Sequence, residues 1–175
     1  MIYITGDCHG NFERFNPSIF PEQNEMTKED YVVICGDFGG VWHREAESKE
    51  ETMKLDWLDS RPFTTLFVCG NHENFDRLYQ YPIENWHGGK VHKIRESVIH
   101  LMRGQVFEIA EKKIFSFGGA SSHDIQGGVL EPDDPEFEKK YDTLTKGYLP
   151  FRINHWSWWK QELPSKEEME EGRQN

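Results

Sequence analysis

Three short runs of apolar, β-branched and aromatic residues alternate with more polar segments in the first half of the chain. They cover Ile2–Thr5, Tyr31–Cys35 and Thr64–Cys69, and a glycine and a polar side chain follow each run. Runs of this length and composition predict strands. Between the second and third runs, Ser48–Asp59 carries apolar residues at helical spacing among charges, which predicts a helix. Strands that alternate with helices favour an α/β fold with a parallel sheet.

The pattern changes after Pro82. Three further strands are expected, and a turn joins the last two; the strands are Ser97–Met102, Gln105–Ile109 and Lys113–Phe117, and the turn is Glu111–Lys113. An acidic excursion between prolines then covers residues 132–150, with a helix expected over Glu136–Leu144. Arg152–Trp159 contains three tryptophans, which either pack in the interior or form a wall beside a substrate.

The end of the chain carries a helix start signal. Ser165 and Glu168 form a capping-box pattern, and the chain stops at Asn175, about two turns later. A helix that short is marginal without packing partners. We therefore expect one domain over residues 1–175 that is truncated after the helix starting near residue 165.

Composition and charge argue against several cellular compartments and several classes of binding partner. The formal net charge of −11 argues against a large nucleic-acid interface, because such interfaces need a basic footprint. No apolar run approaches the ~18 residues of a membrane span, so no membrane partner is expected. The N-terminus shows no signal-peptide pattern, which favours the cytoplasm. Cys-x-x-Cys is absent, so zinc-ribbon and thioredoxin-like classes lack support.

The chemistry of the chain gathers where the first three strands end. The three segments read Gly6-Asp7-Cys8-His9-Gly10, Gly36-Asp37-Phe38-Gly39-Gly40 and Gly70-Asn71-His72-Glu73. Ligands of open α/β sheets bind outside the carboxyl ends of the strands, so these side chains are expected to form one site. Carboxylate, imidazole and amide groups together suit Mn²⁺, Fe²⁺ or Zn²⁺.

With these three motifs, in this order and each after an apolar strand, the sequence resembles the calcineurin-like metallophosphoesterase family over most of the chain. Two later segments resemble a bacterial or phage-type branch: Gly118–Ser121, and Trp158-Trp159 followed by Glu162-Leu163-Pro164-Ser165. The resemblance implies a two-sheet αββα sandwich, part of whose second sheet would be missing here.

The resemblance also implies a site for two divalent metal ions, with manganese favoured over iron or zinc. Asp7 and His9 would bind the first ion, Asp37 would bridge both ions, and Asn71 would bind the second. A metal-bound hydroxide would attack the phosphorus of a phosphate monoester or diester in line with the leaving group. His72 would stabilise the transition state or protonate the leaving oxygen, and Glu73 would orient His72.

The sequence departs from the family in two places. The arginine that usually follows the second motif is missing, and Arg44 is the candidate substitute as a substrate contact. The later histidine motifs that complete both metal sites are also absent, and His123 is the candidate substitute as a ligand or substrate contact. The leading hypothesis is therefore a phosphoesterase acting on a small molecule or a phosphoprotein. The alternative is a truncated, metal-binding remnant without activity; a noncatalytic interaction module would leave the motifs unexplained.

Overall fold

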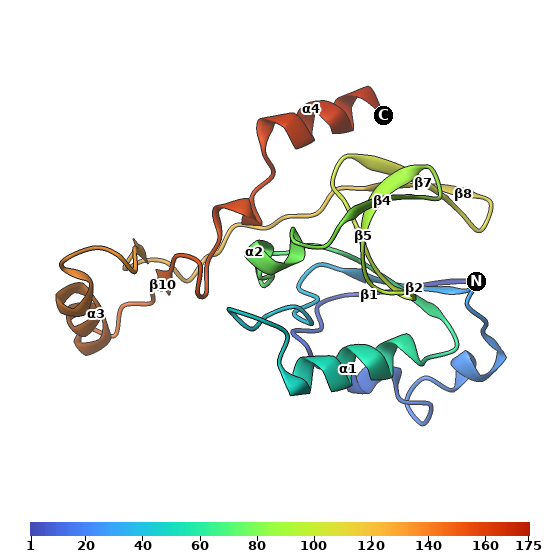
Figure 1. Cartoon of the computed structure of the whole chain (residues 1–175), viewed down its shortest axis with the longest axis horizontal. Helices are drawn as coiled ribbons and strands as arrows, with labels where there is room; N and C mark the ends of the chain where they lie inside the picture. Colours follow the sequence, from blue (N-terminus) through green and yellow to red (C-terminus); the bar gives the residue numbers. More distant parts are fainter.

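A six-stranded sheet forms the centre of the computed structural model, which describes residues 1–175. The strand order is β1-β2-β3-β6-β5-β4 (Figure 1). Four neighbouring strands are parallel: β1 (Ile2–Thr5), β2 (Tyr31–Cys35), β3 (Thr64–Val68) and β6 (Val98–Leu101). The antiparallel strands β5 (Gly89–Arg95) and β4 (Ile83–Trp86) complete one edge.

The remaining elements cover or extend this sheet. Two further strand pairs are the antiparallel hairpin of β7 (Gln105–Ile109) and β8 (Lys112–Ser116), and the short parallel pair of β9 (Val129–Leu130) and β10 (Arg152–Ile153). The helices are α1 (Lys49–Asp59), α2 (Phe75–Leu78), α3 (Phe137–Lys146) and α4 (Lys166–Gln174), with 3-10 turns at Glu13–Phe15, Pro21–Glu25 and Lys160–Glu162. Figure 1 shows α3 at the far end of the longest axis, with β10 between it and the central sheet.

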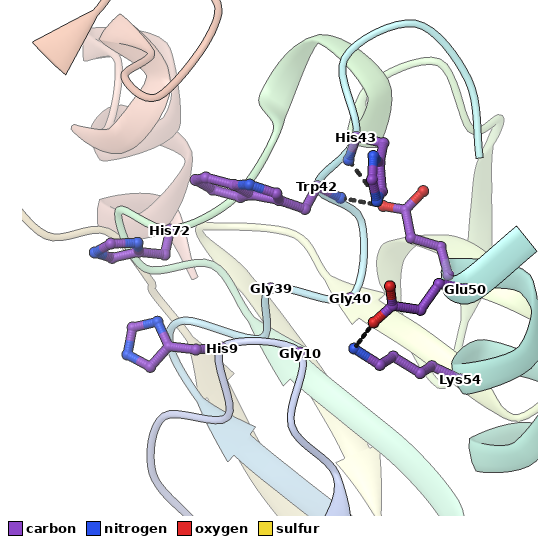
Figure 2. A pocket seen from close by; sticks show the side chains of 10 residues that line it. His9, Gly10, Gly39, Gly40, Trp42, His43, Glu50, Lys54 and His72 are labelled. Carbon is purple, nitrogen blue, oxygen red and sulfur yellow. Dashed lines mark hydrogen bonds and ion pairs between the residues drawn. The ribbon is translucent and has the colours of Figure 1, made fainter. Parts of the chain in front are cut away.

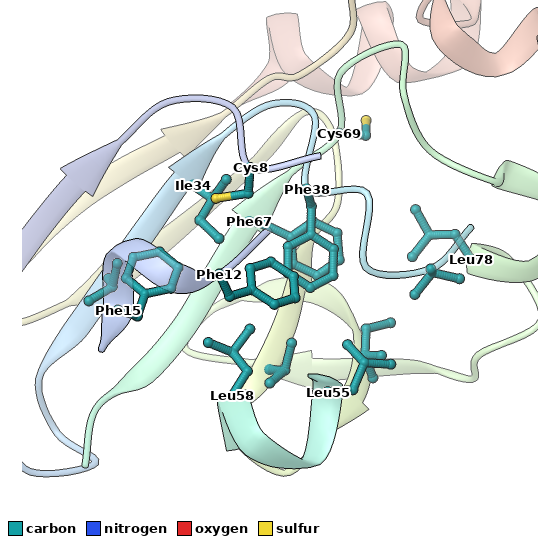
Figure 3. Packing of buried hydrophobic residues seen from close by; sticks show 14 of the residues in the cluster. Cys8, Phe12, Phe15, Ile34, Phe38, Leu55, Leu58, Phe67, Cys69 and Leu78 are labelled. Carbon is teal, nitrogen blue, oxygen red and sulfur yellow. The ribbon is translucent and has the colours of Figure 1, made fainter. Parts of the chain in front are cut away.

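Both faces of the sheet are covered by apolar side chains. Alternate residues of β2 point to opposite faces: Val32 and Ile34 join one buried cluster, and Tyr31 and Val33 join the other. Helix α1 packs on the first cluster (Figure 3), and the β7–β8 hairpin packs on the second. Burial on both faces explains why β2 is apolar along its whole length.

A buried network fixes the start of α1 and the loop before it. Ser48 caps the helix, since its Oγ accepts the backbone N–H of Glu51 at 3.2 Å. The Glu51 carboxylate accepts the N–H groups of Ser48 and His43, and it pairs with the buried guanidinium of Arg77 at 2.7 Å. It also accepts the N–H of Trp42. The helix cap therefore holds the loop that carries Trp42.

The mixed α/β class expected from the sequence is confirmed, and so are the strands and helices expected from it, with small shifts of boundary. The hairpin turn lies at Ala110 and Glu111, both with positive φ, rather than at Glu111–Lys113. Helix α3 covers Phe137–Lys146 instead of Glu136–Leu144. Strands β4 and β5 were not expected from the sequence: β4 is an exposed edge strand, and Lys90, His92, Lys93 and Arg95 leave β5 without an apolar run.

None of the helices combines the length and the apolar composition that crossing a membrane requires.

Two histidines face each other inside the sheet. His92 on β5 and His100 on β6 are direct cross-strand partners, and their rings stack with centroids 5.5 Å apart. Both side chains are buried, and neither ring nitrogen of His100 has a hydrogen-bond partner. Burial lowers the pKa of His92 and lowers the pKa of His100 well below its ordinary value of 6.5.

This pair predicts a loss of stability in mild acid. As pH falls below about 6.5 the unfolded chain binds more protons at these two imidazoles than the folded chain does, so the contribution of the pair to the free energy of unfolding falls. The expected slope is up to about 1.4 kcal/mol per pH unit for each histidine. Urea unfolding across this range measures it. His100→Phe should flatten the slope, and His87→Gln, outside the pair, should keep it; an equal slope in all three proteins would contradict the assignment.

Candidate metal centre

Asp37 connects the loops that follow β1, β2 and β3. Its backbone carbonyl oxygen accepts the N–H groups of Cys8 and His9 at 3.0 and 2.8 Å. Its carboxylate Oδ1 accepts the N–H groups of Asn71 and His72 at 2.9 and 3.0 Å. One residue of the middle loop thus binds both neighbouring loops, and the three motifs meet at the carboxyl edge of the sheet.

The backbone at this meeting point adopts conformations that non-glycine residues rarely take. His9 and Asp37 have φ angles of 49° and 46°. A side chain at Gly70 would place its Cβ 2.0 Å from Asp37 Oδ1, so only glycine permits this approach. Backbone strain of this kind clusters at functional sites, where the surrounding structure enforces it.

The donor atoms of the motif residues lie close together. His9 Nε2 is 3.8 Å from Asp37 Oδ2 and 3.9 Å from Asp7 Oδ2. One ligand atom each from His9, Asp37 and His72 lie within 4.8 Å of one another. Figure 2 shows the imidazoles of His9 and His72 facing one another, and their centroids are 4.7 Å apart. Imidazole and carboxylate donors at these separations fit a divalent transition-metal ion.

Two cavities open on either side of this cluster. Asp7, Asp37, Asn71 and His123 contribute to the wall of a cavity of about 670 Å³, so the structure brings His123 to the same space as the expected ligands. His9, His72 and Trp42 contribute to the wall of a second cavity, of about 240 Å³ (Figure 2). The expected ligands therefore border two cavities.

His72 is half-buried between two rings. It stacks on Trp42 at a centroid distance of 6.0 Å and meets His9 edge-on. Burial lowers the pKa of His72 below its ordinary value, although the charge of Asp37 opposes this shift. A lowered pKa makes the protonated ring a stronger acid. The family resemblance implied that His72 is not a metal ligand, yet its ring belongs to the cluster of possible ligands.

Glu73 does not hold the position expected for it. Its Oε1 accepts the N–H of Phe38 at 2.8 Å and its Oε2 accepts the N–H of Gly39 at 3.2 Å, with no hydrogen bond to the ring of His72. The side chain is buried, and burial raises its pKa to about 8 although these N–H groups favour the charged form. Glu73 therefore supports the loop of Asp37, because buried N–H groups in a tight loop require an acceptor.

Arg44 lies away from the centre. Its guanidinium sits 4.0 Å from the centroid of the Trp156 ring, and it lines neither cavity of the site. Trp159 is fully buried and donates from Nε1 to Asp76 at 2.7 Å, so it packs in the interior. The aromatic wall of the smaller cavity is Trp42 instead, which packs edge-on against Trp159.

An ion pair close to the candidate metal centre was not predicted from the sequence. Arg152 Nε donates to Asp124 Oδ1 at 3.0 Å, and the charges of both residues act on the titration of His72. Asp124 follows the candidate His123 directly, which was the only signal for it. Arg152 comes from β10, and no spacing rule connects it with the three motifs.

A family model described as calcineurin-like phosphoesterase matches residues 1–172. The chain belongs to this family. The match covers the three motif segments that follow β1, β2 and β3. It supports a phosphate-ester hydrolase with divalent metal ions.

Several curated relatives are lariat debranching enzymes. Lariat debranching enzyme A of Xenopus laevis is 27% identical over 161 residues, which are 84% of this chain and 28% of the relative. The enzyme of Danio rerio is 25% identical over 77% of this chain and 25% of its own length. The chain therefore spans only about a quarter of these relatives. They support the family, while the bacterial or phage-type branch stays a prediction. No solved structure matches the chain.

The role found for Glu73 predicts a stability effect. Glu73→Ala leaves at least two buried N–H groups without an acceptor, and we expect it to lower the free energy of unfolding by roughly 2–4 kcal/mol. Glu73→Gln keeps an acceptor oxygen and should lose less. Urea unfolding at neutral pH compares the two variants with the wild type. Equal stability of Glu73→Ala and the wild type would contradict this role.

Proposed function

We propose that this chain builds the metal centre of a phosphoester hydrolase that requires two divalent cations. The observation that supports the proposal most strongly is the convergence of Asp7, His9, Asp37 and Asn71 at one sheet edge, in a chain of the calcineurin-like phosphoesterase family. Manganese is the proposed metal, with iron and zinc as the other candidates for this donor set.

The hydrogen bonds of Asp37 suggest how the cations are shared. Its Oδ1 already accepts two N–H groups, whereas Oδ2 faces His9. Each carboxylate oxygen has about two acceptor positions, so Asp37 keeps free acceptor positions on Oδ2 and would help to hold the cations. In this proposal Asp7 and His9 complete the first position and Asn71 the second. When bound, the cations supply activation of water and neutralise charge on the phosphate.

His72 is the proposed proton donor to the leaving oxygen. Its imidazole borders the smaller cavity beside Trp42, where a leaving group would lie. The aromatic face of Trp42 offers a stacking surface for an aryl group or a base. His123 is the proposed contact for the substrate on the other side, in the larger cavity.

The proposed substrate class rests on the names of the relatives and on the net charge of the chain. Their name suggests a phosphodiester in a lariat-type branched RNA. The net charge of −11 argues against a long backbone interface, so we propose that recognition involves only the few groups around the scissile phosphate. Small phosphomonoesters and phosphoproteins are the other substrate classes of the proposal.

Hydrolysis assays test the proposal. An aryl phosphate monoester, an aryl phosphate diester and a branched RNA oligonucleotide are each incubated with the chain, with and without Mn²⁺. We expect turnover that depends on Mn²⁺ and falls at least about 100-fold in Asp37→Asn, because the bridging charge is lost. Asp142→Asn, on the exposed face of α3, serves as the matched control.

The alternative, a metal-binding remnant, predicts a different result. It would give folded protein that binds Mn²⁺ and shows no turnover above Asp37→Asn on any of the three substrates. That outcome would contradict the proposed hydrolase.

A further inference from the structure

A line of hydrogen bonds runs from Asn71 into the interior of the protein. Asn71 Nδ2 donates to Ser122 Oγ at 3.2 Å, and Ser122 Oγ donates to Glu162 Oε2 at 2.6 Å. The backbone N–H of Ser122 donates to the other carboxylate oxygen, Oε1, at 2.9 Å. Ser122 follows the Gly118–Ser121 segment and Glu162 belongs to the segment after the tryptophans, so this line accounts for residues of two regions that the metal centre left unexplained.

Ser122 and Glu162 are both held firmly in place. Their exposed fractions are 5% and 2%. The carbonyl oxygen of Glu162 accepts the N–H of Ala120 at 3.2 Å, which ties its 3-10 turn to the loop of Ser122. Arg103 donates to the neighbouring carbonyl oxygen of Gln161 at 2.8 Å, and Trp159, fully buried, anchors the start of the same turn.

The hydrogen bonds of this line all donate in one direction, from Asn71 toward Glu162. Both oxygens of Glu162 accept hydrogen bonds from Ser122, Oε1 from the backbone N–H and Oε2 from the hydroxyl, so the hydroxyl of Ser122 donates its hydrogen to Glu162. Ser122 Oγ can then only accept from Asn71, which requires the NH₂ end of the Asn71 amide. The amide oxygen, Oδ1, is the end left free, and Asn71 lines the cavity that Asp7 and Asp37 also line.

We propose that Ser122 and Glu162 are positioning residues that fix the amide of Asn71 with its oxygen toward the metal centre. The purpose of this arrangement rests on the proposed function, since only the oxygen of an amide is a useful ligand for a hard or borderline cation. The backbone of Asn71 is already bound to Asp37, and the line to Glu162 fixes the remaining side-chain freedom.

Glu162→Gln tests the direction of the line with almost no change of shape. The amide oxygen of the new side chain must face the N–H of Ser122, so its NH₂ group faces Ser122 Oγ. The hydroxyl of Ser122 then points to Asn71, and the Asn71 amide is expected to turn its oxygen inward and its NH₂ group outward. Ser122→Ala removes the line, and Ser122→Thr keeps a hydroxyl and should restore it. Ser97→Ala is the matched control, because Ser97 is a buried serine directly before β6, at the amino end of the parallel strands and so at the opposite end from the motifs.

Two measurements read the result. In the metal-free protein, the ¹H–¹⁵N signals of the Asn71 side-chain NH₂, assigned by their absence in Asn71→Asp, report its hydrogen bond. A titration with Mn²⁺, followed by electron paramagnetic resonance of the free ion, reports affinity. We expect Glu162→Gln and Ser122→Ala to shift the NH₂ signals and to speed the exchange of these protons with solvent. We also expect both variants to bind one Mn²⁺ ion about 10- to 100-fold more weakly.

NH₂ signals that are the same in Glu162→Gln, Ser122→Ala and the wild type would overturn the inference, as would signals that shift equally in Ser97→Ala. A wild-type chain that binds no Mn²⁺ would instead count against the proposed function, while the metal-free NH₂ signals would still decide the role of Ser122 and Glu162.

Discussion

The hydrogen bonds of Asp37 hold the three strand-end loops in one arrangement. Its carbonyl oxygen binds the first loop and its Oδ1 binds the third. Glu73, from the third loop, accepts hydrogen bonds from the two N–H groups that follow Asp37. Parallel strands bring loop ends near one another, but they do not set distances between side chains. The reciprocal bonds between Asp37 and the third loop set those distances, and they leave Oδ2 facing His9.

The packing of the rest of the fold offsets the energetic cost of this arrangement. Left-handed backbone at His9 and Asp37 costs of order 1–3 kcal/mol for each residue. The sheet that carries both loops is buried on its two faces, by α1 on one side and by the β7–β8 hairpin on the other. A second buried carboxylate, Glu51, holds the loop of Trp42 through backbone N–H groups in the same way as Glu73 holds its neighbour. Buried carboxylates that accept N–H bonds are therefore a repeated device around the site.

The strands that carry the motifs could be predicted from the sequence because their signals are local. Apolar runs such as Tyr31–Cys35 are short, continuous and followed by glycine, and Ser48 begins its helix with a capping box. The edge strand β4 lacks such a signal because it is exposed. The convergence of Asp7, His9 and Asp37 followed from parallel topology, which the alternation of strands and helices favoured.

What could not be predicted depends on contacts between distant parts of the chain. The resemblance implied that Glu73 orients His72, but a motif does not say where a carboxylate points. Ser122 and Glu162 are 40 residues apart, and Arg152 and Asp124 are 28 residues apart. No periodic pattern connects such pairs, so only the folded structure brings them together.

Anomalous diffraction from crystals of the chain soaked in Mn²⁺ tests the central claim most directly, since it places the ion without reference to catalysis. We expect anomalous density bound by Asp37 Oδ2 and His9, with Asp7 beside it. Density at other residues alone, or no density at a concentration of Mn²⁺ that supports binding in solution, would contradict the claim that these loops form a metal centre.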